Sequence, residues 1–228
     1  MPTLNKISRL LAAGDLSEIN ALLEQARFVD GRMSAGIQAQ RNKSNREVAN
    51  DDVVLKKLNA IIMPKLIANA DYQAIALPCK IAEPYYSLYR QGDYYGDHTD
   101  NPVMGLSPYI YRSDIAMTIF LNNPDEYEGG ELSIGTLEGE HTLRVKYAAG
   151  DAVLYPATTT HRVEPIKSGR RVVAVTWIQS LIPNVQHREL LYRLRKAQDR
   201  IRDASADSNE VKELEWLYNN LFRMWTQI

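Results

Sequence analysis

The chain is poor in cysteine and carries no excess of charge of either sign. Its 228 residues include a single cysteine, Cys79, which excludes an intramolecular disulfide framework. Cys79 lies in the apolar run AIALPCKIA, so we expect it to be buried as a small hydrophobic residue. With 27 basic and 28 acidic side chains, the formal net charge is −1. A bulk positive field for nucleic acid or an anionic membrane is therefore excluded, and partners must bind at local sites.

Long apolar runs are missing as well. No segment approaches the roughly 20 consecutive apolar residues that cross a bilayer, and the N-terminus lacks the charged and then apolar pattern of a secretory leader. A hydrophobic content of 45% and a charged content of 24% are ordinary for a globular protein with one large domain and an appendage. We therefore expect a cytoplasmic protein that has neither a membrane nor a nucleic acid as its partner.

The sequence divides into three regions that differ in the spacing of their apolar residues. Residues 1–72 have apolar residues at helical spacing and predict a helical support region. Residues 73–181 change to short β-rich segments between turn residues and predict the core of the protein. Residues 182–228 return to helical spacing and predict a C-terminal helical segment. The expected fold class is α+β.

The N-terminal region predicts three helical pieces. The segment 3–26 has apolar residues such as Ile7 at helical spacing and reads as two pieces, interrupted near Gly14. The segment 27–48 reads as a connection or a short hairpin. A third helix is expected in DDVVLKKLNAIIMPKLIANA, where Asp51 or Asp52 could cap the start and Pro64 should kink or end the helix.

The central region predicts an antiparallel sandwich or barrel. Its β-rich segments are separated by Gly, Pro, Asn or Asp clusters, and this spacing argues against a doubly wound sheet. The segments are KIAEPYYSLYR, SDIAMTIFLNN, GELSIGT, HTLRVKY, DAVLYPA, THRVEPI and RRVVAVTWIQS.

Two helices are expected after Pro183. The segment NVQHRELLYRLRKAQDRIRD predicts a strongly charged helix, and its mixed charges indicate a solvated face. An apolar stripe runs along the last helix and indicates that the pair packs on the core. The stripe consists of Val211, Leu214, Leu217, Leu221 and Trp225. The sequence does not determine an oligomeric state.

The stretch GDYYGDHTDNP carries the first sign of chemistry. In an extended segment, His98 and Asp100 point to the same side, because side chains alternate along a strand. His161, in the strand-like segment ATTTHRVEPI, supplies a second imidazole. Two histidines and one carboxylate leave three positions of an octahedral metal open, which is typical of non-haem Fe(II) oxygenases.

A basic residue follows His161 at a distance that suits a role in ligand binding. Arg171 lies ten residues after His161, and a hairpin centred near Ser168 would pair His161 with Val175. Arg171 would then share the face of His161, four residues or roughly 13 Å along the strand. A guanidinium fork there could grip the distal carboxylate of a five-carbon diacid whose other end binds the metal. Arg170, on the opposite face, could not do so.

Longer motifs resemble a known family. YSLYRQGDYYGDHTDNP, DEYEGGELSI and AGDAVLYPATTTHRVEPIKSGRRVVAVTWIQS resemble the Fe(II)- and 2-oxoglutarate-dependent dioxygenases of the prolyl 4-hydroxylase-like superfamily. The segment ARFVDGRMSAGIQAQRNKSN and the helical tail are similar to the bacterial PKHD-type hydroxylases, the PiuC and YbiX family. The resemblance covers essentially the whole chain.

The resemblance implies a double-stranded β-helix, or jelly-roll, that holds Fe(II) through His98, Asp100 and His161. It also implies 2-oxoglutarate as co-substrate, bound by Arg171, and molecular oxygen as oxidant, with succinate and a hydroxylated substrate as products. Ascorbate is associated with such enzymes as the reductant of the iron. Tyr89 fits a tyrosine of the superfamily pattern that contacts the co-substrate carboxylate, and Tyr86 and Tyr95 lie near enough in sequence to compete for this role.

Other readings of the same residues stay open at this stage. A protein that binds iron and 2-oxoglutarate as a sensor, without turnover, would use the same ligands. A zinc hydrolase also accepts two histidines and a carboxylate, but it leaves Arg171 unexplained. A halogenase is disfavoured, because Asp100 occupies the position that halide needs. The remaining histidines, His141 and His187, are expected to be structural.

The substrate cannot be read from the motifs. Kinship suggests prolyl hydroxylation and, through family associations, a link to iron uptake or homeostasis. A small molecule and a peptidyl side chain both stay open as substrates.

Overall fold

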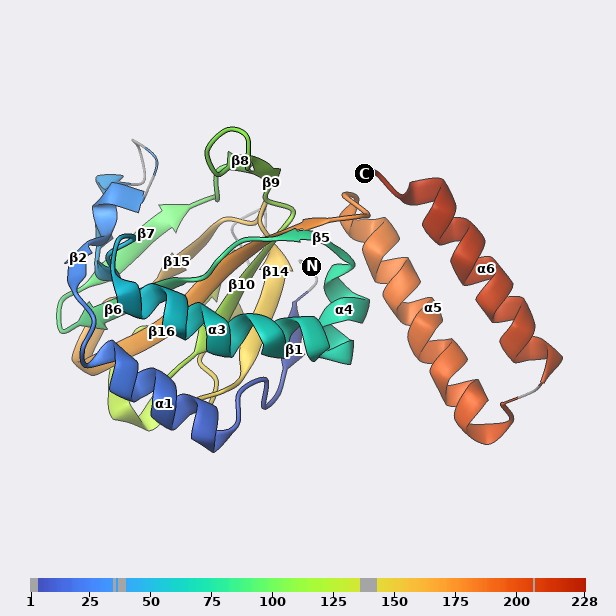
Figure 1. Ribbon diagram of the computed structural model, residues 1–228, viewed down its shortest axis with the longest axis horizontal. Coiled ribbons are helices and arrows are strands. Elements are labelled where there is room, and N and C mark those ends of the chain that lie inside the picture. Colours follow the sequence, from blue (N-terminus) through green and yellow to red (C-terminus); the bar gives the residue numbers. More distant parts are fainter. Residues whose placement is uncertain (1–3, 35, 37–39, 136–142, 207) are drawn as a thin grey trace.

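The computed structural model describes residues 4–34, 36, 40–135, 143–206 and 208–228. Two β-sheets that face each other make the body of the molecule (Figure 1). Within the described residues, the larger sheet has nine strands. Seven follow the order β1 (Asn5–Ile7), β14 (Ala152–Pro156), β10 (Ile115–Phe120), β16 (Ile166–Ser180), β6 (Tyr85–Arg90), β4 (Arg46–Val48) and β2 (Phe28–Asp30), while β5 (Pro78–Ile81) and β11 (Tyr127–Gly129) also pair with β16.

The smaller sheet lies across from it and is also antiparallel. Its five described strands follow the order β13 (Leu143–Val145), β12 (Leu132–Ile134), β15 (His161–Val163), β7 (Tyr94–His98) and β3 (Lys43–Ser44). A separate hairpin, β8 (Val103–Met104) with β9 (Tyr111–Arg112), stands at one end of the two sheets (Figure 1). This arrangement is a double-stranded β-helix with added helices, so the predicted α+β jelly-roll fold is confirmed.

Strand β16 runs through the centre of the molecule and serves two cores. Its side chains alternate between the faces of the sheet, as strand geometry requires. Val172 and Ala174 pack toward the helices on the outer face. Val173 belongs to the core between the two sheets, where Val175 and Trp177 also pack. The alternation VVAVTW therefore predicts both cores from one strand.

Helices cover the outer face of the larger sheet. They are α1 (Ala13–Leu23), α3 (Val53–Ala68) and the short α4 (Ala70–Ala76), and the first two cross the sheet in Figure 1. The Asp52 side chain caps α3 by accepting a hydrogen bond from the amide of Val54, as one of the two predicted caps. Pro64 does not end the helix, which continues to Ala68.

The first predicted helical piece is wrong. Residues 5–7 form β1, which pairs antiparallel with β14, and Ile7 lies opposite Ala152. The apolar residues Ile7, Leu10 and Leu11 are buried, but they reach the core from a strand and the turn after it. Three apolar residues at helical spacing are too few to distinguish a helical turn from a short strand.

Residues 27–48, which were expected to form a connection or a short hairpin, contribute strands to both sheets. β2 pairs antiparallel with β4 in the larger sheet, and the short 3-10 helix η1 (Gly31–Ser34) follows β2. β3 joins the smaller sheet instead, beside β7. The N-terminal region thus adds edge strands to the jelly-roll as well as helices. The boundaries at residues 72 and 181 stay predictions.

The predicted hairpin between His161 and Arg171 is wrong. β15 pairs with β12 and β7 in the smaller sheet, whereas β16 pairs with β6 and β10 in the larger one. Val175 lies opposite Tyr85 and Thr118, not opposite His161. Residues 164–165 carry the chain from one sheet to the other, and Gly169, at φ +75°, lies within β16 opposite Tyr127. The glycine next to the predicted centre of the hairpin therefore marks a close contact between β16 and β11 and not a turn.

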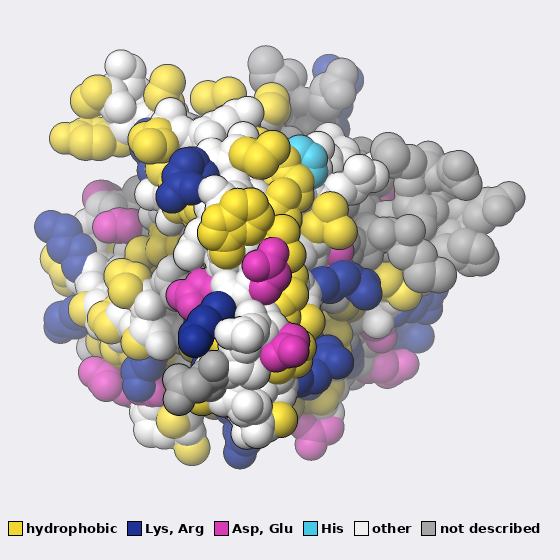
Figure 2. Space-filling model, turned by 90° about the vertical axis from the view of Figure 1, so that its right-hand side faces the viewer, with side chains coloured by type: hydrophobic (Ala, Val, Ile, Leu, Met, Phe, Trp, Pro, Cys, Tyr) yellow, Lys and Arg dark blue, Asp and Glu magenta, His cyan; other side chains and the backbone are white. Residues whose placement is uncertain are grey.

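The two helices predicted after Pro183 form a pair, which extends beyond the barrel instead of lying along its core. It consists of α5 (Val185–Ala204) and α6 (Asn209–Trp225), which pack against each other (Figure 1). From the predicted stripe, Leu221 and Trp225 pack on a small core that includes Ile182 and Leu191. The outer face of α6 leaves Trp216 exposed, and Figure 2 shows that hydrophobic and charged side chains mix on this side of the molecule.

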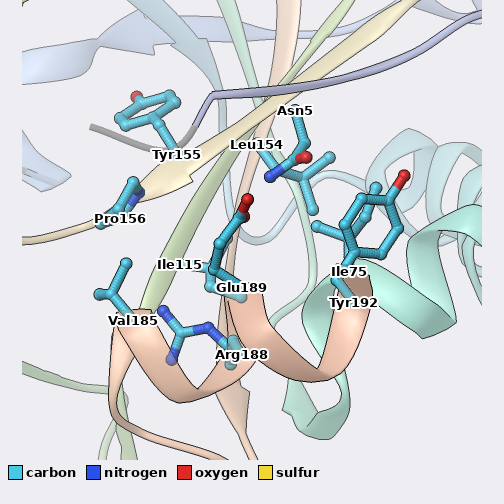
Figure 3. Close-up of a pocket in the computed structure, with 10 residues that line it drawn as sticks. All are labelled: Asn5, Ile75, Ile115, Leu154, Tyr155, Pro156, Val185, Arg188, Glu189 and Tyr192. Atoms are coloured by element: carbon cyan, nitrogen blue, oxygen red, sulfur yellow. The ribbon is translucent and has the colours of Figure 1, made fainter. Parts of the chain in front are cut away.

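A buried arginine anchors the pair at its base. The guanidinium of Arg188 donates hydrogen bonds to the carbonyl oxygens of Ile182 and Pro183, at 2.6 and 2.7 Å. Burial lowers the pKa of Arg188 to about 10. A cavity of about 30 Å³ lies beside it, between α5 and β14 (Figure 3). This volume holds about one water molecule, so the cavity is a packing gap and not a ligand site.

Cys79 is only partly buried, contrary to the expected burial, because it lies on β5 at the side of β16.

In the part of the chain that the structure describes, we find no helix with the length and apolar character needed to cross a membrane.

Candidate metal centre and co-substrate pocket

His98, Asp100 and His161 meet at one end of the smaller sheet. His98 ends β7 and His161 begins β15, and the two residues lie directly opposite each other in the strand register. Asp100 follows two residues after His98 and turns back toward His161, with 3.9 Å between Asp100 Oδ1 and His161 Nε2. One ligand atom from each of the three side chains lies within 4.8 Å of the other two. The three predicted ligands are therefore brought together.

Backbone carbonyl groups orient both imidazoles. His98 Nδ1 lies 2.8 Å from the carbonyl oxygen of Gly96, and His161 Nδ1 lies 3.0 Å from that of Thr159. A carbonyl only accepts, so each Nδ1 donates a proton to it, and Nε2 is the ring nitrogen left to face a metal. Burial, with repulsion from His161 as the second cause, lowers the pKa of His98 to about 3. For His98, burial therefore favours the neutral imidazole that a metal would bind, although the hydrogen bond to Gly96 acts in the opposite direction.

The carboxylate of the cluster has an unused oxygen. Asp100 Oδ2 is buried and has no hydrogen-bond partner among the described residues. Burial is also the main cause that raises the pKa of Asp100, because a desolvated carboxylate is disfavoured. A divalent cation would neutralise this carboxylate and occupy its free oxygen. The donor set of two imidazoles and one carboxylate thus fits Fe(II).

Aromatic rings hold the cluster in place. The Tyr95 ring stacks on His98 with 3.6 Å between ring centres, and Tyr155 meets His161 edge to face at 5.0 Å. Tyr155 was not among the predicted residues. It follows the buried AVL of β14, and this strand pattern alone does not distinguish a site wall from core packing.

Arg171 points into the same cavity from the larger sheet. It is only 1% exposed, and the cavity it lines also contains all three residues of the cluster. In the described part of the chain, Arg171 makes no ion pair, and its Nε is buried without a hydrogen-bond partner, as is the hydroxyl of Tyr127. A buried guanidinium requires an anion, so this end of the cavity fits a carboxylate. Arg170 instead points outward and pairs with Glu24, as its predicted opposite face requires.

Close packing fixes the Arg171 side chain. Its guanidinium carbon lies 5.1 Å from the centre of the Tyr89 ring and 5.9 Å from that of Phe120. Gly130 has φ +67°, and a Cβ there would lie 3.2 Å from Arg171 Cδ. The glycine in YEGGEL therefore gives Arg171 its room, a role that was not predicted.

The three candidate tyrosines separate clearly. Tyr89 and Tyr95 line the cavity. Tyr86 lies on the other face of β6, where its hydroxyl donates to Asn59 Oδ1 at 2.9 Å. Tyr89 is 4% exposed, and burial raises its pKa, so its hydroxyl stays protonated and can donate a hydrogen bond. Tyr89 and Tyr95 remain as candidates for contact with a co-substrate.

The other two histidines do not join the cluster within the described residues. His187 lies on α5, where its ring stacks on Trp225 with 4.1 Å between centres. It therefore has a packing role, as expected. His141 lies outside the described residues.

The cavity also contains charged residues that sequence reasoning missed. Lys43 and Glu47 line it from β3 and β4, and Nζ and Oε1 lie 2.6 Å apart. Their only signal in the sequence is a spacing of four, which in a helix would indicate a surface pair. Here each residue belongs to a different sheet.

Comparisons with known proteins identify the family of the chain. Residues 85–179 match the model of the 2OG-Fe(II) oxygenase superfamily, and residues 186–227 match that of the PKHD-type hydroxylase C-terminal domain. A PKHD-type hydroxylase of Thioalkalivibrio sulfidiphilus is 40% identical over 222 residues, which are 97% of this chain and 98% of that protein. One from Stutzerimonas stutzeri is 36% identical and covers 98% of this chain and 99% of its own length.

A solved structure shows the same fold. A Pseudomonas putida prolyl-4-hydroxylase aligns with a TM-score of 0.53 at 16% identity, covering 79% of this chain and 94% of that one. At this identity the likeness extends to the fold alone, whereas the full-length relatives identify the family. The chain belongs to the PKHD-type hydroxylases, which are Fe(II)- and 2-oxoglutarate-dependent dioxygenases.

Proposed function

We propose that His98, Asp100 and His161 hold the catalytic Fe(II), and that Arg171 binds the distal carboxylate of 2-oxoglutarate. The observation that carries this proposal is the buried Arg171, which lacks an acidic partner among the described residues and shares one cavity with the cluster. When bound, iron and 2-oxoglutarate supply oxygen activation, in which 2-oxoglutarate is decarboxylated to succinate and a substrate C–H bond is hydroxylated.

The residues of the chain divide the work of this site. The two imidazoles and the carboxylate would hold the metal and supply three ligands, and a bound metal would then have positions left for co-substrate and oxygen. The planar fork of Arg171 matches a carboxylate bidentately, and its burial keeps water from competing. Tyr89 donates a further hydrogen bond to the same carboxylate, because its hydroxyl stays protonated beside Arg171.

Two parts of the proposal are predictions from the family relationship: ascorbate as the reductant of the iron, and a link to iron metabolism. We expect ascorbate to sustain turnover by keeping the iron reduced. A link to iron uptake or homeostasis follows from family association and not from any described residue. The substrate is a small molecule or a peptidyl side chain.

Anaerobic titration tests the co-substrate site. Fe(II)-loaded protein should develop a weak visible charge-transfer band as 2-oxoglutarate is added. Arg171→Gln should require at least about 10-fold more 2-oxoglutarate, because it loses a charge-assisted hydrogen bond in a buried site. Arg170→Gln is the matched control, since the neighbouring guanidinium points outward, and it should titrate as the wild type.

Oxygen then separates enzyme from sensor. On exposure to oxygen, the wild type should convert 2-oxoglutarate to succinate, and ascorbate should prolong this conversion. A protein that forms the band but never yields succinate, with ascorbate and a wide range of candidate substrates present, would be the binding protein without turnover. A protein that takes up iron but forms no band would contradict the proposed role of Arg171.

A further inference from the structure

The cavity is larger than a metal and a five-carbon diacid require. Its volume is about 800 Å³, which lies within the usual range for sites that hold drug-sized ligands. Lys43 and Glu47 line a part of it to which the proposed function assigns no role.

The pair forms where the chain crosses between the sheets. Lys43 lies on β3 of the smaller sheet and Glu47 on β4 of the larger one, with Asn45 between the two strands. The side chains are 6% and 8% exposed, and their 2.6 Å contact is a buried ion pair. Such pairs add little net stability, because desolvation of both charges offsets their attraction. Stability alone is therefore a weak reason to keep this pair at a cavity wall.

Each member of the pair has bonding capacity left over. Lys43 Nζ donates to Glu47 Oε1 and to Ser34 Oγ, so one of its three N–H groups has no described partner. The hydrogen bonds to Glu47 all reach Oε1, from Lys43 and, at 3.5 Å, from Asn45 and Ser87. Glu47 Oε2 accepts none from the described residues, and the Glu47 side chain keeps 8% of its surface exposed. One donor and one acceptor thus stand side by side.

The pair lies close to the metal centre. Lys43 Nζ is 5.0 Å from the centre of the Tyr95 ring, and this ring stacks on His98. A group held by the pair is therefore about one aromatic ring away from a proposed iron ligand. The pair and the proposed iron ligands also line the same cavity.

Charge limits what this group can be. Lys43 and Glu47 neutralise each other, so a ligand with one net charge would leave a buried charge without compensation. A neighbouring ammonium and carboxylate satisfy both free positions and keep the site neutral. The ligand's remaining body meets apolar walls, because Met104, Pro108 and Tyr109 of the β8–β9 hairpin line the same cavity.

Building on the proposed function, we propose that the substrate is a free amino acid, held by its zwitterionic head group at Lys43 and Glu47. The carboxylate accepts from Lys43 Nζ and the ammonium donates to Glu47 Oε2. One atom of oxygen enters a C–H bond near the head group, and the other enters the succinate that 2-oxoglutarate forms on losing carbon dioxide. The apolar hairpin favours an amino acid with an apolar or aromatic side chain.

The test begins with the anaerobic complex of protein, Fe(II) and 2-oxoglutarate. Its visible band reports the proposed function, and a failure to form it would count against that function first. The band is then followed while L-leucine, L-proline or L-phenylalanine is added, and each is compared with its N-acetyl and methyl ester derivatives. At least one free amino acid should shift the band and raise succinate formation in oxygen. Both blocked forms of that amino acid should fail, because each lacks one of the two charges.

Variants of the pair locate the binding. Glu47→Gln and Lys43→Met should keep the band and its dependence on 2-oxoglutarate, but weaken amino-acid binding by at least about 10-fold, since each removes one partner of a buried charged contact. Lys65→Met is the matched control, because Lys65 pairs with Asp15 outside the cavity. The proposal is overturned if no free amino acid shifts the band, if blocked forms bind equally well, or if the Lys43 and Glu47 variants bind as the wild type does.

Discussion

His161 and Arg171 lie on facing sheets of the barrel, although only ten residues of chain separate them. The short connection at residues 164–165 moves the chain from the smaller sheet to the larger one. Both side chains then point into the same cavity. The proposed metal ligand and the proposed carboxylate anchor can thus bind the two ends of one small diacid while belonging to different layers of the fold.

Loss of the carboxylate ligand should abolish tight iron binding. We expect Asp100→Ala to weaken Fe(II) binding by more than about 100-fold, since loss of a group that only orients a ligand already costs about 10- to 100-fold. The iron content after dialysis measures this change. Asp97→Ala is the control, because Asp97 is an exposed carboxylate that contacts Arg162, and it should retain iron. Equal iron contents in the two variants would exclude Asp100 as a ligand.

A glycine should control the position of Arg171. In Gly130→Ala, the new Cβ would meet Ile166, Tyr127 and Arg171 at a positive φ, so we expect a loss of about 1–3 kcal/mol in the free energy of unfolding. Affinity for 2-oxoglutarate should fall with it, because the Arg171 side chain must shift. Urea unfolding and the anaerobic titration measure the two effects.

The matched control lies in α1. Gly14 has no atom within 4 Å of its would-be Cβ and lies in a helix. Gly14→Ala should stabilise the protein by about 0.5–1 kcal/mol and leave 2-oxoglutarate binding unchanged. A Gly130→Ala variant that matches Gly14→Ala in both measurements would show that the glycine does not position Arg171.

The tyrosines near the pocket should respond differently to loss of the hydroxyl. Tyr89→Phe should weaken 2-oxoglutarate binding about 2- to 10-fold, the effect of one hydrogen bond, while Tyr95→Phe should keep both the affinity and the ring stack on His98. Tyr86→Phe should bind normally but lose about 1 kcal/mol of stability, because it breaks the bond to Asn59. A larger loss of affinity in Tyr95→Phe than in Tyr89→Phe would reverse the assignment.

The helical pair should depend on its buried arginine. Arg188→Met removes the donors to the Ile182 and Pro183 carbonyls, so we expect a loss of about 1–3 kcal/mol in urea unfolding. Arg193→Met removes a charge from the same helix, but its side chain is 75% exposed and pairs with Glu189, four residues before it. This control should lose less than about 1 kcal/mol. Equal losses would mean that Arg188 is not the anchor.

Local spacing predicted the candidate metal cluster and the fold class. His98 ends β7 and Asp100 follows two residues later, just beyond the strand, so their common direction follows from extended chain geometry. The same reasoning placed Arg171 on the inner face of its strand but wrongly drew a hairpin to His161. The wrong pairing did not change the expectation that His161 and Arg171 face the same cavity, because the inner faces of both sheets line it.

Features that depend on long-range pairing could not be predicted. Lys43 and Glu47 meet because two strands separated by Asn45 join different sheets, and no local pattern encodes that crossing. Ile7 looked helical because its strand is only three residues long and is specified by β14, far away in the sequence. Pro64 did not end α3, whose Ile62 and Leu66 pack in the core on either side of it.

Alternate residues of strand β16 face the helices on one side and the cavity on the other. Val172 and Ala174 pack against the helices, whereas Arg171, Val175 and Trp177 line the cavity. Substitutions at the second set can reshape the cavity while the helix packing of the first set is preserved. A library restricted to positions 175 and 177 would therefore explore new substrate selectivities while it leaves the packing of the sheet against the helices unchanged, with its cost in stability confined to the core between the two sheets.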